Sequence, residues 1–380
     1  MRVIVVGAGI VGLSTAWALV RAGHDVRVFE QGPVPNPLGA SVDQHRLIRH
    51  AYGTSRGYTL MVDQAFRAWD RMWADLGERL YAEAGVLVLS NQAQGDWVER
   101  TAATLRDLGR DVPWLTADEV GRRFPPLNTD GLRSAFLLPA GGVLFAGRIV
   151  EALARHLEGR GVRIRAMTRV AGVDPDRARV VLADGTVEDA DALVVAAGAW
   201  VDRLLPTMAA RVKPSRQVVA YLDPPAGLAD AWARMPAIME IDPAEGFYLV
   251  PPVGGTGLKI GDHRFSLAGD PDHGREAAPD ETAAVAALAG RRIRDFERYR
   301  PAAGKVCFYT AQPDEEFVVE PIGPNAWVMS PCSGHGFKFG AVMGEAMAAA
   351  LSDSVAAGRI TDWAAGRTEG PLVGAGLPSA

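Results

Sequence analysis

Residues 3–30 predict a strand, a glycine-rich turn, a helix and a second strand in close succession. The β-branched run Val3-Ile4-Val5-Val6 is followed by Gly7-Ala8-Gly9-Ile10-Val11-Gly12. An Ala- and Leu-rich segment then extends to Gly23, and a short apolar run ends at Glu30. Glycines at these spacings, between a strand and a helix, form the fingerprint of a dinucleotide-binding βαβ unit.

Each residue of this fingerprint has a distinct expected role. Gly7 permits the tight turn, Gly9 lets the backbone approach a pyrophosphate, and Gly12 lets the helix pack close to the strand. The first turn of the helix offers free N–H groups to the pyrophosphate, and Glu30 is placed to accept hydrogen bonds from ribose hydroxyls. A signal peptide is excluded, because glycines interrupt the apolar run and no small-residue cleavage site follows. The predicted contacts are Gly7, Gly9, Ile10, Val11, Gly12 and Glu30.

Composition and charge exclude several classes of protein. The chain has 380 residues, 48% of them hydrophobic and 22% charged, and a formal net charge of −5. This length suits two domains with sizeable cores, and the charge gives no reason to expect nucleic-acid binding. No long apolar window lacks charges or glycines, so no membrane span is predicted. Two cysteines, Cys307 and Cys332, without a secretory signal favour a cytoplasmic location, and we expect no metal site.

After the fingerprint, the sequence predicts a further parallel strand and then a second sheet, which is antiparallel. The apolar run 192–200 predicts a buried parallel strand, where Gly198 lets the backbone pass close to a ligand. Residues 218–309 change to short strands, prolines and one helix at 280–296, which indicates a largely antiparallel sheet. A glycine-rich turn at 333–340 opens the final helix. The predicted fold class is α/β (α+β), with a Rossmann-like dinucleotide-binding domain and a second, mainly antiparallel β-sheet substrate domain.

This organisation predicts domain boundaries. The dinucleotide-binding domain is expected to be discontinuous, comprising residues 1–82, 140–212 and 314–362. The substrate and catalytic domain is expected to comprise residues 83–139 and 213–313. The remaining residues, 363–380, are rich in Gly, Ala and Pro and are expected to form a disordered tail.

Four further motifs follow the fingerprint in order: Arg46–Gly53 (RLIRHAYG), Gly255–Gly261 (GTGLKIG), Val306–Thr310 (VCFYT) with Pro-Asp-Glu close behind, and Ser333–Phe339 (SGHGFKF). Over residues 1–360 the chain resembles the monomeric sarcosine oxidase and N-methyl amino acid oxidase family of D-amino-acid-oxidase-like flavoproteins. The resemblance implies FAD rather than NAD, and a monomer. It implies oxidation of the C–N bond of a small secondary (N-methyl or cyclic) amino acid to an imine that hydrolyses, with O₂ reduced to hydrogen peroxide.

The resemblance also implies that Cys307 binds FAD covalently through a thioether. Side chains two or four apart on a strand share a face, so Cys307 and Tyr309 are expected to point the same way, as are Lys259 and His263. Taken alone, Cys307 better suits a small buried core residue, and only the intact motif favours the covalent flavin. Cys332 matches no family ligand and is expected to pack, with a Cys307–Cys332 disulfide as the remaining option.

Two lysines and two arginines stand in the matched motifs. The resemblance places Lys259 near flavin N5, where a fixed cation stabilises superoxide as it forms. It places Lys338 near the flavin pyrimidine edge and, with Arg49, on the substrate carboxylate, which an arginine fork suits. Arg46 matches a flavin-side arginine. Either lysine alone could equally be a surface lysine with a buried stem.

The remaining predicted site residues surround the substrate or the flavin. By resemblance, Tyr248, Tyr309 and His263 line the substrate cavity, where aromatic faces hold the amine. The flavin contacts outside the fingerprint are expected at Arg46, Gly198, Cys307, Gly334, Gly336, Phe337 and Lys338. His45 and His50 are expected to have structural roles. No carboxylate in the motifs is an obvious base, so the amine is expected to react in its neutral form.

Other functions remain open from the sequence. The chain could be a flavin-dependent dehydrogenase that uses another electron acceptor, which Lys259 disfavours, or a biosynthetic oxidase of a bulkier amine-carboxylate. A non-catalytic flavin-binding scaffold is a further alternative, which Arg49, Lys338 and Cys307 disfavour. A NAD-dependent enzyme is the last, which the 192–200 strand and Lys338 disfavour. Residues 239–242, Phe247 and Phe308 do not identify a substrate.

Overall fold

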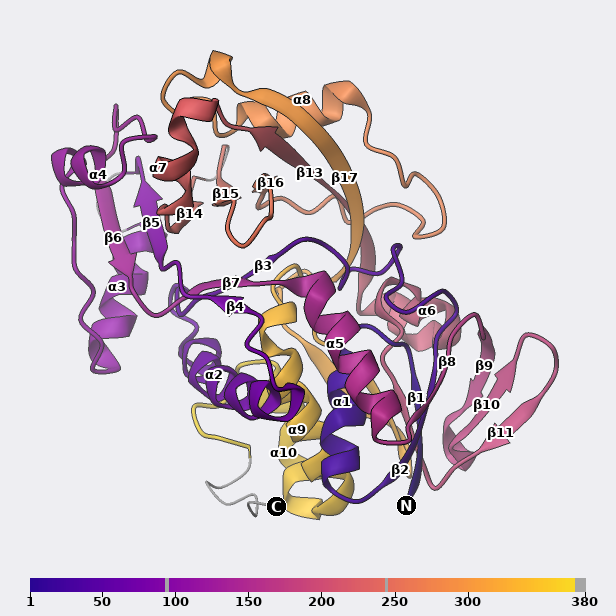
Figure 1. Cartoon of the computed structure of the whole chain (residues 1–380). Coiled ribbons are helices and arrows are strands. Elements are labelled where there is room, and N and C mark those ends of the chain that lie inside the picture. The colour runs from indigo at the N-terminus through magenta and orange to yellow at the C-terminus, as the bar shows by residue number, and fades with distance from the viewer. Residues whose placement is uncertain (93–95, 243–244, 373–380) are drawn as a thin grey trace.

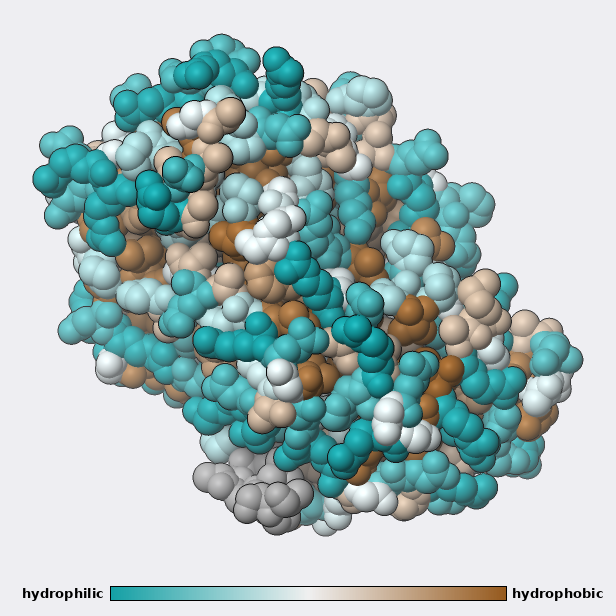
Figure 2. Space-filling view, in the orientation of Figure 1, coloured by the Kyte–Doolittle hydropathy of each residue, from teal (hydrophilic) through white to brown (hydrophobic). Residues whose placement is uncertain are grey.

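The computed structural model describes residues 1–92, 96–242 and 245–372. Two large β-sheets lie in separate layers, and most helices cover the first of them (Figure 1). None of the helices in these described ranges is both long and apolar enough to cross a lipid bilayer. On the face shown in Figure 2, apolar side chains of the described residues lie as scattered spots among hydrophilic ones rather than as one broad patch.

The first sheet is the parallel sheet that the fingerprint predicts. Its strand order is β18-β19-β12-β1-β2-β8, and only the edge strand β18 runs antiparallel to its neighbour. Both faces are covered, so the central strands are almost continuously buried. The strands are β1 (Arg2–Val6), β2 (Asp25–Phe29), β8 (Arg163–Arg165), β12 (Ala192–Val195), β18 (Val318–Gly323) and β19 (Ala326–Ser330).

Small residues let the helices of this layer pack tightly. A Cβ atom at Gly344 would lie only 2.2 Å from the carbonyl oxygen of Ser14, so the first and ninth helices meet backbone to backbone. The helices are α1 (Ile10–Arg21), α2 (Arg56–Leu76), α5 (Ala146–Gly159), α6 (Val201–Leu204), α9 (Gly340–Ser352) and α10 (Ser354–Ala364). This packing fixes α1 against the sheet and therefore fixes the glycine turn that precedes it.

The second sheet is mainly antiparallel, as predicted. Its strand order is β17-β13-β16-β15-β14-β5-β6, with one parallel pair, β14 and β5. The strands are β5 (Val86–Ser90), β6 (Ser134–Leu138), β13 (Lys213–Asp223), β14 (Ala237–Glu240), β15 (Phe247–Val250), β16 (Leu258–Asp262) and β17 (Arg300–Ala311). The helices of this layer are α3 (Trp97–Asp107), α4 (Ala117–Arg123), α7 (Ala229–Ala233) and α8 (Pro279–Ala287).

Two small sheets complete the fold. The strands β3 (Arg46–Ile48), β4 (Tyr81–Ala82) and β7 (Gly142–Leu144) form a three-stranded sheet between the two large layers (Figure 1). The strands β9 (Val170–Asp174), β10 (Arg179–Leu182) and β11 (Val187–Asp189) form the other. Because β3 carries the start of the basic motif, its position places those cations where the two layers meet.

The strands of the two large sheets fall within the segments expected for the two domains, although the exact domain boundaries stay a prediction. The expectation of a disordered tail is wrong for residues 363–372. Trp363 is buried in α10, Leu372 is buried, and Arg367 pairs with Glu316. Although Gly and Pro are frequent in this segment, its apolar side chains pack against the rest of the protein. Residues 373–380 lie outside the described residues.

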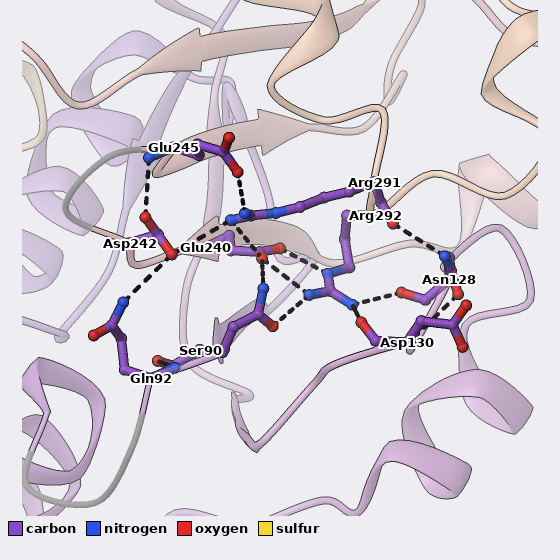
Figure 3. A network of polar contacts seen from close by, with 10 residues as sticks. Ser90, Gln92, Asn128, Asp130, Glu240, Asp242, Glu245, Arg291 and Arg292 are labelled. Atoms are coloured by element: carbon purple, nitrogen blue, oxygen red, sulfur yellow. Dashed lines mark hydrogen bonds and ion pairs between the residues drawn. The ribbon is translucent and has the colours of Figure 1, made fainter.

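A buried ion pair explains why the helix predicted at 280–296 is shorter. The helix α8 ends at Ala287, and the chain then turns so that Arg292 points inward, where it donates two hydrogen bonds to Glu240 at 2.7 and 2.9 Å. Both side chains are at most 1% exposed. The Arg292 guanidinium also donates to Asn91 and to the backbone of Asn128 (Figure 3). Glu240 therefore ties the end of β14 to the loops that follow β5 and α8.

Removing one partner of this pair should destabilise the protein strongly. The variant Glu240→Gln leaves the Arg292 charge buried without its counter-ion, and we expect a loss of about 3–5 kcal/mol in the free energy of unfolding. Chemical denaturation measures it. Asp130→Asn is a matched control, because Asp130 is exposed and gives Arg292 only its backbone carbonyl. Equal stabilities of the two variants would contradict this role for Glu240.

Candidate active site

A cavity of about 720 Å³ lies where the two large sheets meet, and residues of both sheets line it. Its size falls within the usual range of cofactor and ligand sites. Among the predicted site residues, Gly12, Lys259 and Cys307 do not reach its surface. The predicted residues that line it are Gly7, Gly9, Ile10, Val11, Glu30, Arg46, Arg49, Gly198, Tyr248, His263, Tyr309, Gly334, Gly336, Phe337 and Lys338.

The glycine turn forms one end of the cavity. Gly7 has φ of +105°, and a Cβ atom there would lie 2.3 Å from the carbonyl oxygen of Ala196. A Cβ atom at Gly12 would lie 1.9 Å from the carbonyl oxygen of Gly7, so Gly12 serves close packing and does not line the cavity. Only glycine fits both positions, which agrees with the roles that the fingerprint predicts. The N–H of Ile10 donates to Ser41 Oγ at 2.9 Å, so Ser41 also fixes this turn.

Glu30 is buried beside the turn and binds its backbone. Its Oε2 accepts a hydrogen bond from the N–H of Ala8 at 2.9 Å. Its Oε1 accepts from the N–H of Gly32 at 3.0 Å and from Asn36 Nδ2 at 2.9 Å. A carboxylate oxygen has two acceptor sites, so one remains on Oε2, at the cavity wall. The carboxylate thus holds the glycine turn and can still accept from a hydroxyl.

A buried carboxylate, Asp43, organises the cations at the centre of the site. It is 8% exposed and accepts hydrogen bonds from Lys259 Nζ at 2.6 Å and from the Tyr221 hydroxyl at 2.5 Å. It also pairs with Arg46. Burial alone would raise the pKa of Asp43, but Lys259 and Arg46 hold it well below its usual value. Asp43 is therefore a carboxylate throughout the physiological range.

Lys259 is almost fully buried, behind the wall of the cavity. Its Nζ donates to Asp43 and, at 3.2 Å, to the backbone carbonyl of His45, and lies 5.8 Å from the centre of the Tyr248 ring. Burial lowers the pKa of Lys259 to about 8, although the charge of Asp43 acts to raise it. Lys259 therefore has a fixed counter-ion, unlike a surface lysine whose ammonium group lies in solvent.

Cys307 is buried next to these cations. Tyr309, two residues further along β17, and Gln217, its register partner on β13, both line the cavity. Burial raises the pKa of the Cys307 thiol, while Arg46 and Lys259 act to lower it. Both cysteines are free, so no disulfide joins Cys307 and Cys332. Cys332, which we expected only to pack, is itself part of the cavity wall.

Arg49 and Lys338 meet at the ring of Tyr52. The guanidinium carbon of Arg49 lies 4.5 Å and Lys338 Nζ 5.4 Å from the ring centre. Lys338 Nζ donates to the Tyr52 hydroxyl at 2.9 Å and to the carbonyl of His335 at 2.7 Å. Burial, and then the nearby Arg49, lower the pKa of Lys338 well below its usual value. Neither cation forms an ion pair with a carboxylate in the part of the chain that the structure describes.

Three uncharged groups form the neighbouring wall. The Tyr248 ring lies over its register partner, Gly261, where a Cβ atom would approach the Tyr248 hydroxyl to 2.4 Å. The centre of the His263 ring lies 6.0 Å from that of Tyr248. Burial, and then Arg49, lower the pKa of His263 to about 4, so its imidazole is neutral near pH 7. Burial raises the pKa of Tyr309 well above its usual value, and it stays protonated.

The carboxyl-end loops supply the other predicted contacts. Gly198 and Gly334 have φ of +53° and +73°, respectively, and both line the cavity. His45 and His50 have the structural roles expected: His45 is fully buried with Nε2 3.0 Å from the carbonyl of Gly257, and His50 pairs with Asp63 at 3.0 Å. Sequence reasoning missed Asp43, Ser41 and Tyr52. Tyr52 lies inside the quoted RLIRHAYG motif, and Asp43 is a lone acid beside a basic segment.

Comparisons with known proteins identify the family of the chain. Residues 2–350 match the family model of FAD dependent oxidoreductases. The chain is 30% identical over 360 residues to monomeric sarcosine oxidase of Bacillus sp. (strain B-0618), covering 91% of this chain and 90% of that protein. It is 28% identical to N-methyl-L-tryptophan oxidase of Yersinia pestis (strain Pestoides F), covering 92% and 94%.

A solved structure shares the fold. A modified fructosyl peptide oxidase from Aspergillus nidulans superimposes with a TM-score of 0.81 at 21% identity, covering 93% of this chain and 91% of that one. The relatives thus act on different amines, while the family match spans nearly the whole chain. The chain belongs to the FAD-dependent oxidoreductase family.

Proposed function

We propose that this protein is an oxidase that converts the C–N bond of a small secondary amino acid, N-methyl or cyclic, to an imine and reduces O₂ to hydrogen peroxide. One observation carries the proposal: the basic groups of Arg49 and Lys338 meet at the cavity that begins at the glycine turn, and neither forms an ion pair with a carboxylate among the described residues. An unpaired buried cation is costly, so this wall suits an anionic ligand. The sequence relationship to sarcosine and N-methyl-L-tryptophan oxidases supports an amino acid.

The residues present fit an FAD molecule. The glycine turn excludes any side chain at Gly7, the first turn of α1 faces the cavity, and Glu30 keeps an acceptor for a ribose hydroxyl. Arg46 and the glycine-rich turn at Gly334 and Gly336 would hold the flavin end. When bound, the flavin would supply a two-electron acceptor for the substrate. We further propose that Cys307 attaches it covalently, because Cys307 shares a strand face with Tyr309 at the cavity wall.

The protein's own groups would bind and orient the substrate. Arg49 and Lys338 would receive the carboxylate, while Tyr248, Tyr309 and the neutral His263 would surround the amine. These three groups carry no charge near pH 7, so they favour a neutral amine, whose lone pair is available. Glu315 also lines the cavity, and burial raises its pKa although Arg49 acts to lower it. A carboxyl group is therefore nearer to the substrate than the motifs alone suggested.

A dehydrogenase that passes electrons to another carrier is the second candidate. One observation favours it: Lys259, the proposed oxygen-activating cation, stands behind the cavity wall and is paired with Asp43. The two functions differ in their products. Equal amounts of peroxide formed and substrate consumed indicate the oxidase, whereas rapid dye reduction with little peroxide indicates the dehydrogenase.

Acid precipitation of the purified protein tests the covalent bond. The yellow colour should remain in the pellet of the natural protein and move to the supernatant in Cys307→Ser, because a hydroxyl cannot form the thioether. Cys332→Ser is the matched control, since Cys332 is the cysteine that lines the cavity but is assigned no bond to the flavin, and its colour should stay in the pellet. Release of colour from the natural protein would refute covalent attachment.

Substrates with and without a carboxylate test the roles of Arg49 and Lys338. An N-methyl amino acid should bind more tightly than the matching amine, and Arg49→Ala or Lys338→Ala should each remove about 1.5–3 kcal/mol of binding free energy. Flavin absorbance changes under anaerobic conditions measure binding and reduction separately. Both variants should affect the amine without a carboxylate much less. An amine that proves as good a substrate as its amino acid would show that these roles are wrong.

The variant Lys259→Met tests the reaction with oxygen. If the Lys259 charge stabilises the developing superoxide, reoxidation by O₂ should slow by about 10²–10³-fold, while anaerobic reduction changes far less. Stopped-flow absorbance follows the two half-reactions separately. Lys305→Met is the control, because Lys305 is also near Asp43, at 3.8 Å, but is one-third exposed. Unchanged reoxidation in a folded Lys259→Met protein would refute the role of Lys259 in the reaction with oxygen.

A further inference from the structure

Asp43 connects three parts of the chain that are distant in sequence. It lies in the loop that leads into β3, and its carboxylate pairs with Arg46 of that strand. The other contacts come from the second sheet: Lys259 of β16 donates at 2.6 Å and Tyr221 of β13 at 2.5 Å. The side chain of Asp43 is only 4% exposed. A buried carboxylate with three side-chain partners fixes the positions and charges of the groups that it contacts.

We propose that Asp43 is a positioning residue that holds Lys259 in its charged form and in a fixed orientation, and so sets the upper pH limit of the reaction with oxygen. The proposal deepens the proposed function, because it rests on the assignment of Lys259 to that half-reaction. Asp43 itself does not line the cavity, so it acts through Lys259.

The geometry supports an orienting role. An ammonium group has three donors. Two of those on Lys259 are used, by Asp43 and by the carbonyl of His45 at 3.2 Å, which leaves one N–H for a ligand or a bridging water. Without Asp43, the long side chain would keep a single backbone acceptor. The carboxylate therefore determines where the remaining N–H points.

The charges around Lys259 support the second part of the proposal. Arg46 from β3 is positive, and Lys305 from β17 lies 3.8 Å from Asp43. The groups on the other neighbouring elements are neutral near pH 7: burial lowers the pKa of His45 to about 3, and it raises the pKa of Cys307 and of Tyr248. Among these neighbours, Asp43 is the only negative charge. Its loss would leave burial and Arg46 acting together to discharge Lys259.

The direction of the pH effect follows from these charges. Burial lowers the pKa of Lys259 to about 8 even with Asp43 in place. Lys259 should therefore be charged below about pH 8 and lose its proton above it. An opposite charge at this range typically shifts a pKa by about 1–3 units, so Asp43→Asn should move this loss of charge to correspondingly lower pH.

The first test measures flavin reoxidation by O₂ in the holoenzyme between pH 6 and 10. In the natural protein the rate constant should fall as pH rises through about 8, and in Asp43→Asn it should fall at least about one pH unit lower. Asp43→Glu should restore the higher limit, whereas Lys259→Arg should remove the fall, because arginine stays charged. Identical profiles for the natural protein and Asp43→Asn would overturn the proposal.

The second test needs no turnover and measures the stability difference between the natural protein and Asp43→Asn against pH. While Lys259 is charged in the natural protein, the ion pair adds stability. Between the lower pKa of Lys259 in Asp43→Asn and about pH 8, only the natural protein keeps the lysine proton in the folded state. The stability difference should therefore narrow as pH rises through this window and level off above about pH 8. In a Lys259→Met background the difference should not vary over this range. A difference that is independent of pH in both backgrounds would overturn the proposal, whether or not the protein makes peroxide.

Tyr221→Phe provides a variant that keeps the carboxylate if Asp43→Asn fails to fold. It removes one donor from Asp43, so the negative charge acts on Lys259 at least as strongly, and the pH limit of reoxidation should stay at or above the natural value. A lower limit in this variant would contradict the proposal. Substrate oxidation without peroxide would instead refute the proposed function, and normal reoxidation in Lys259→Met would refute the assignment of Lys259. The stability test still reports on the ion pair in both cases.

Discussion

The backbone at Gly7 leaves no room for a single extra carbon atom, and the arrangement of the site depends on this contact. The end of β1, the end of β12 and the start of α1 meet at this turn. A Cβ atom at Gly7 would lie 2.3 Å from the carbonyl oxygen of Ala196, and one at Gly12 would lie 1.9 Å from the carbonyl oxygen of Gly7. The neighbouring strand β2 fixes the same turn: Gly7 donates its N–H to Phe29, and Glu30 accepts from Ala8. Because these hydrogen bonds and close contacts fix the turn, the first N–H groups of α1 point in one direction. A bound pyrophosphate requires such preorganisation.

The other half of the site depends on how buried positive charge is balanced. Around Lys259 and Arg46, one carboxylate, Asp43, accepts from both cations. Around Lys338 and Arg49, no such carboxylate forms an ion pair within the described residues, and the polar partners are the Tyr52 hydroxyl and backbone carbonyls. The first pair is complete without a ligand, whereas the second is not. Lys259 and Arg46 are therefore balanced by the protein itself, whereas Lys338 and Arg49 would be balanced by a bound anion.

The same distinction explains what the sequence could and could not predict. The places of Gly7, Gly12 and Glu30 at the turn were predictable because they depend on neighbours within one βαβ unit, while the ribose contact of Glu30 stays a prediction. Asp43 was not, because its partners Tyr221 and Lys259 are 178 and 216 residues away and only the fold brings them together. The helix expected at 280–296 failed for a similar reason: local propensity favoured it, but the distant Glu240 draws Arg292 inward. Trp363 likewise anchors a segment whose composition indicated disorder.

The two buried lysines of the site differ in whether the protein supplies a counter-ion. Lys259 has a fixed counter-ion, so its charge does not depend on a substrate. Lys338 has none among residues 1–92, 96–242 and 245–372, and burial with Arg49 lowers its pKa well below the usual value. A carboxylate that arrives beside Lys338 would favour the charged form and raise that pKa, so binding of an anion is coupled to uptake of a proton. A neutral ligand of the same shape would gain nothing from this coupling. On the proposed function, the wall at Tyr52 would therefore favour a charged group, while the uncharged wall of Tyr248, Tyr309 and His263 would favour a neutral group opposite it.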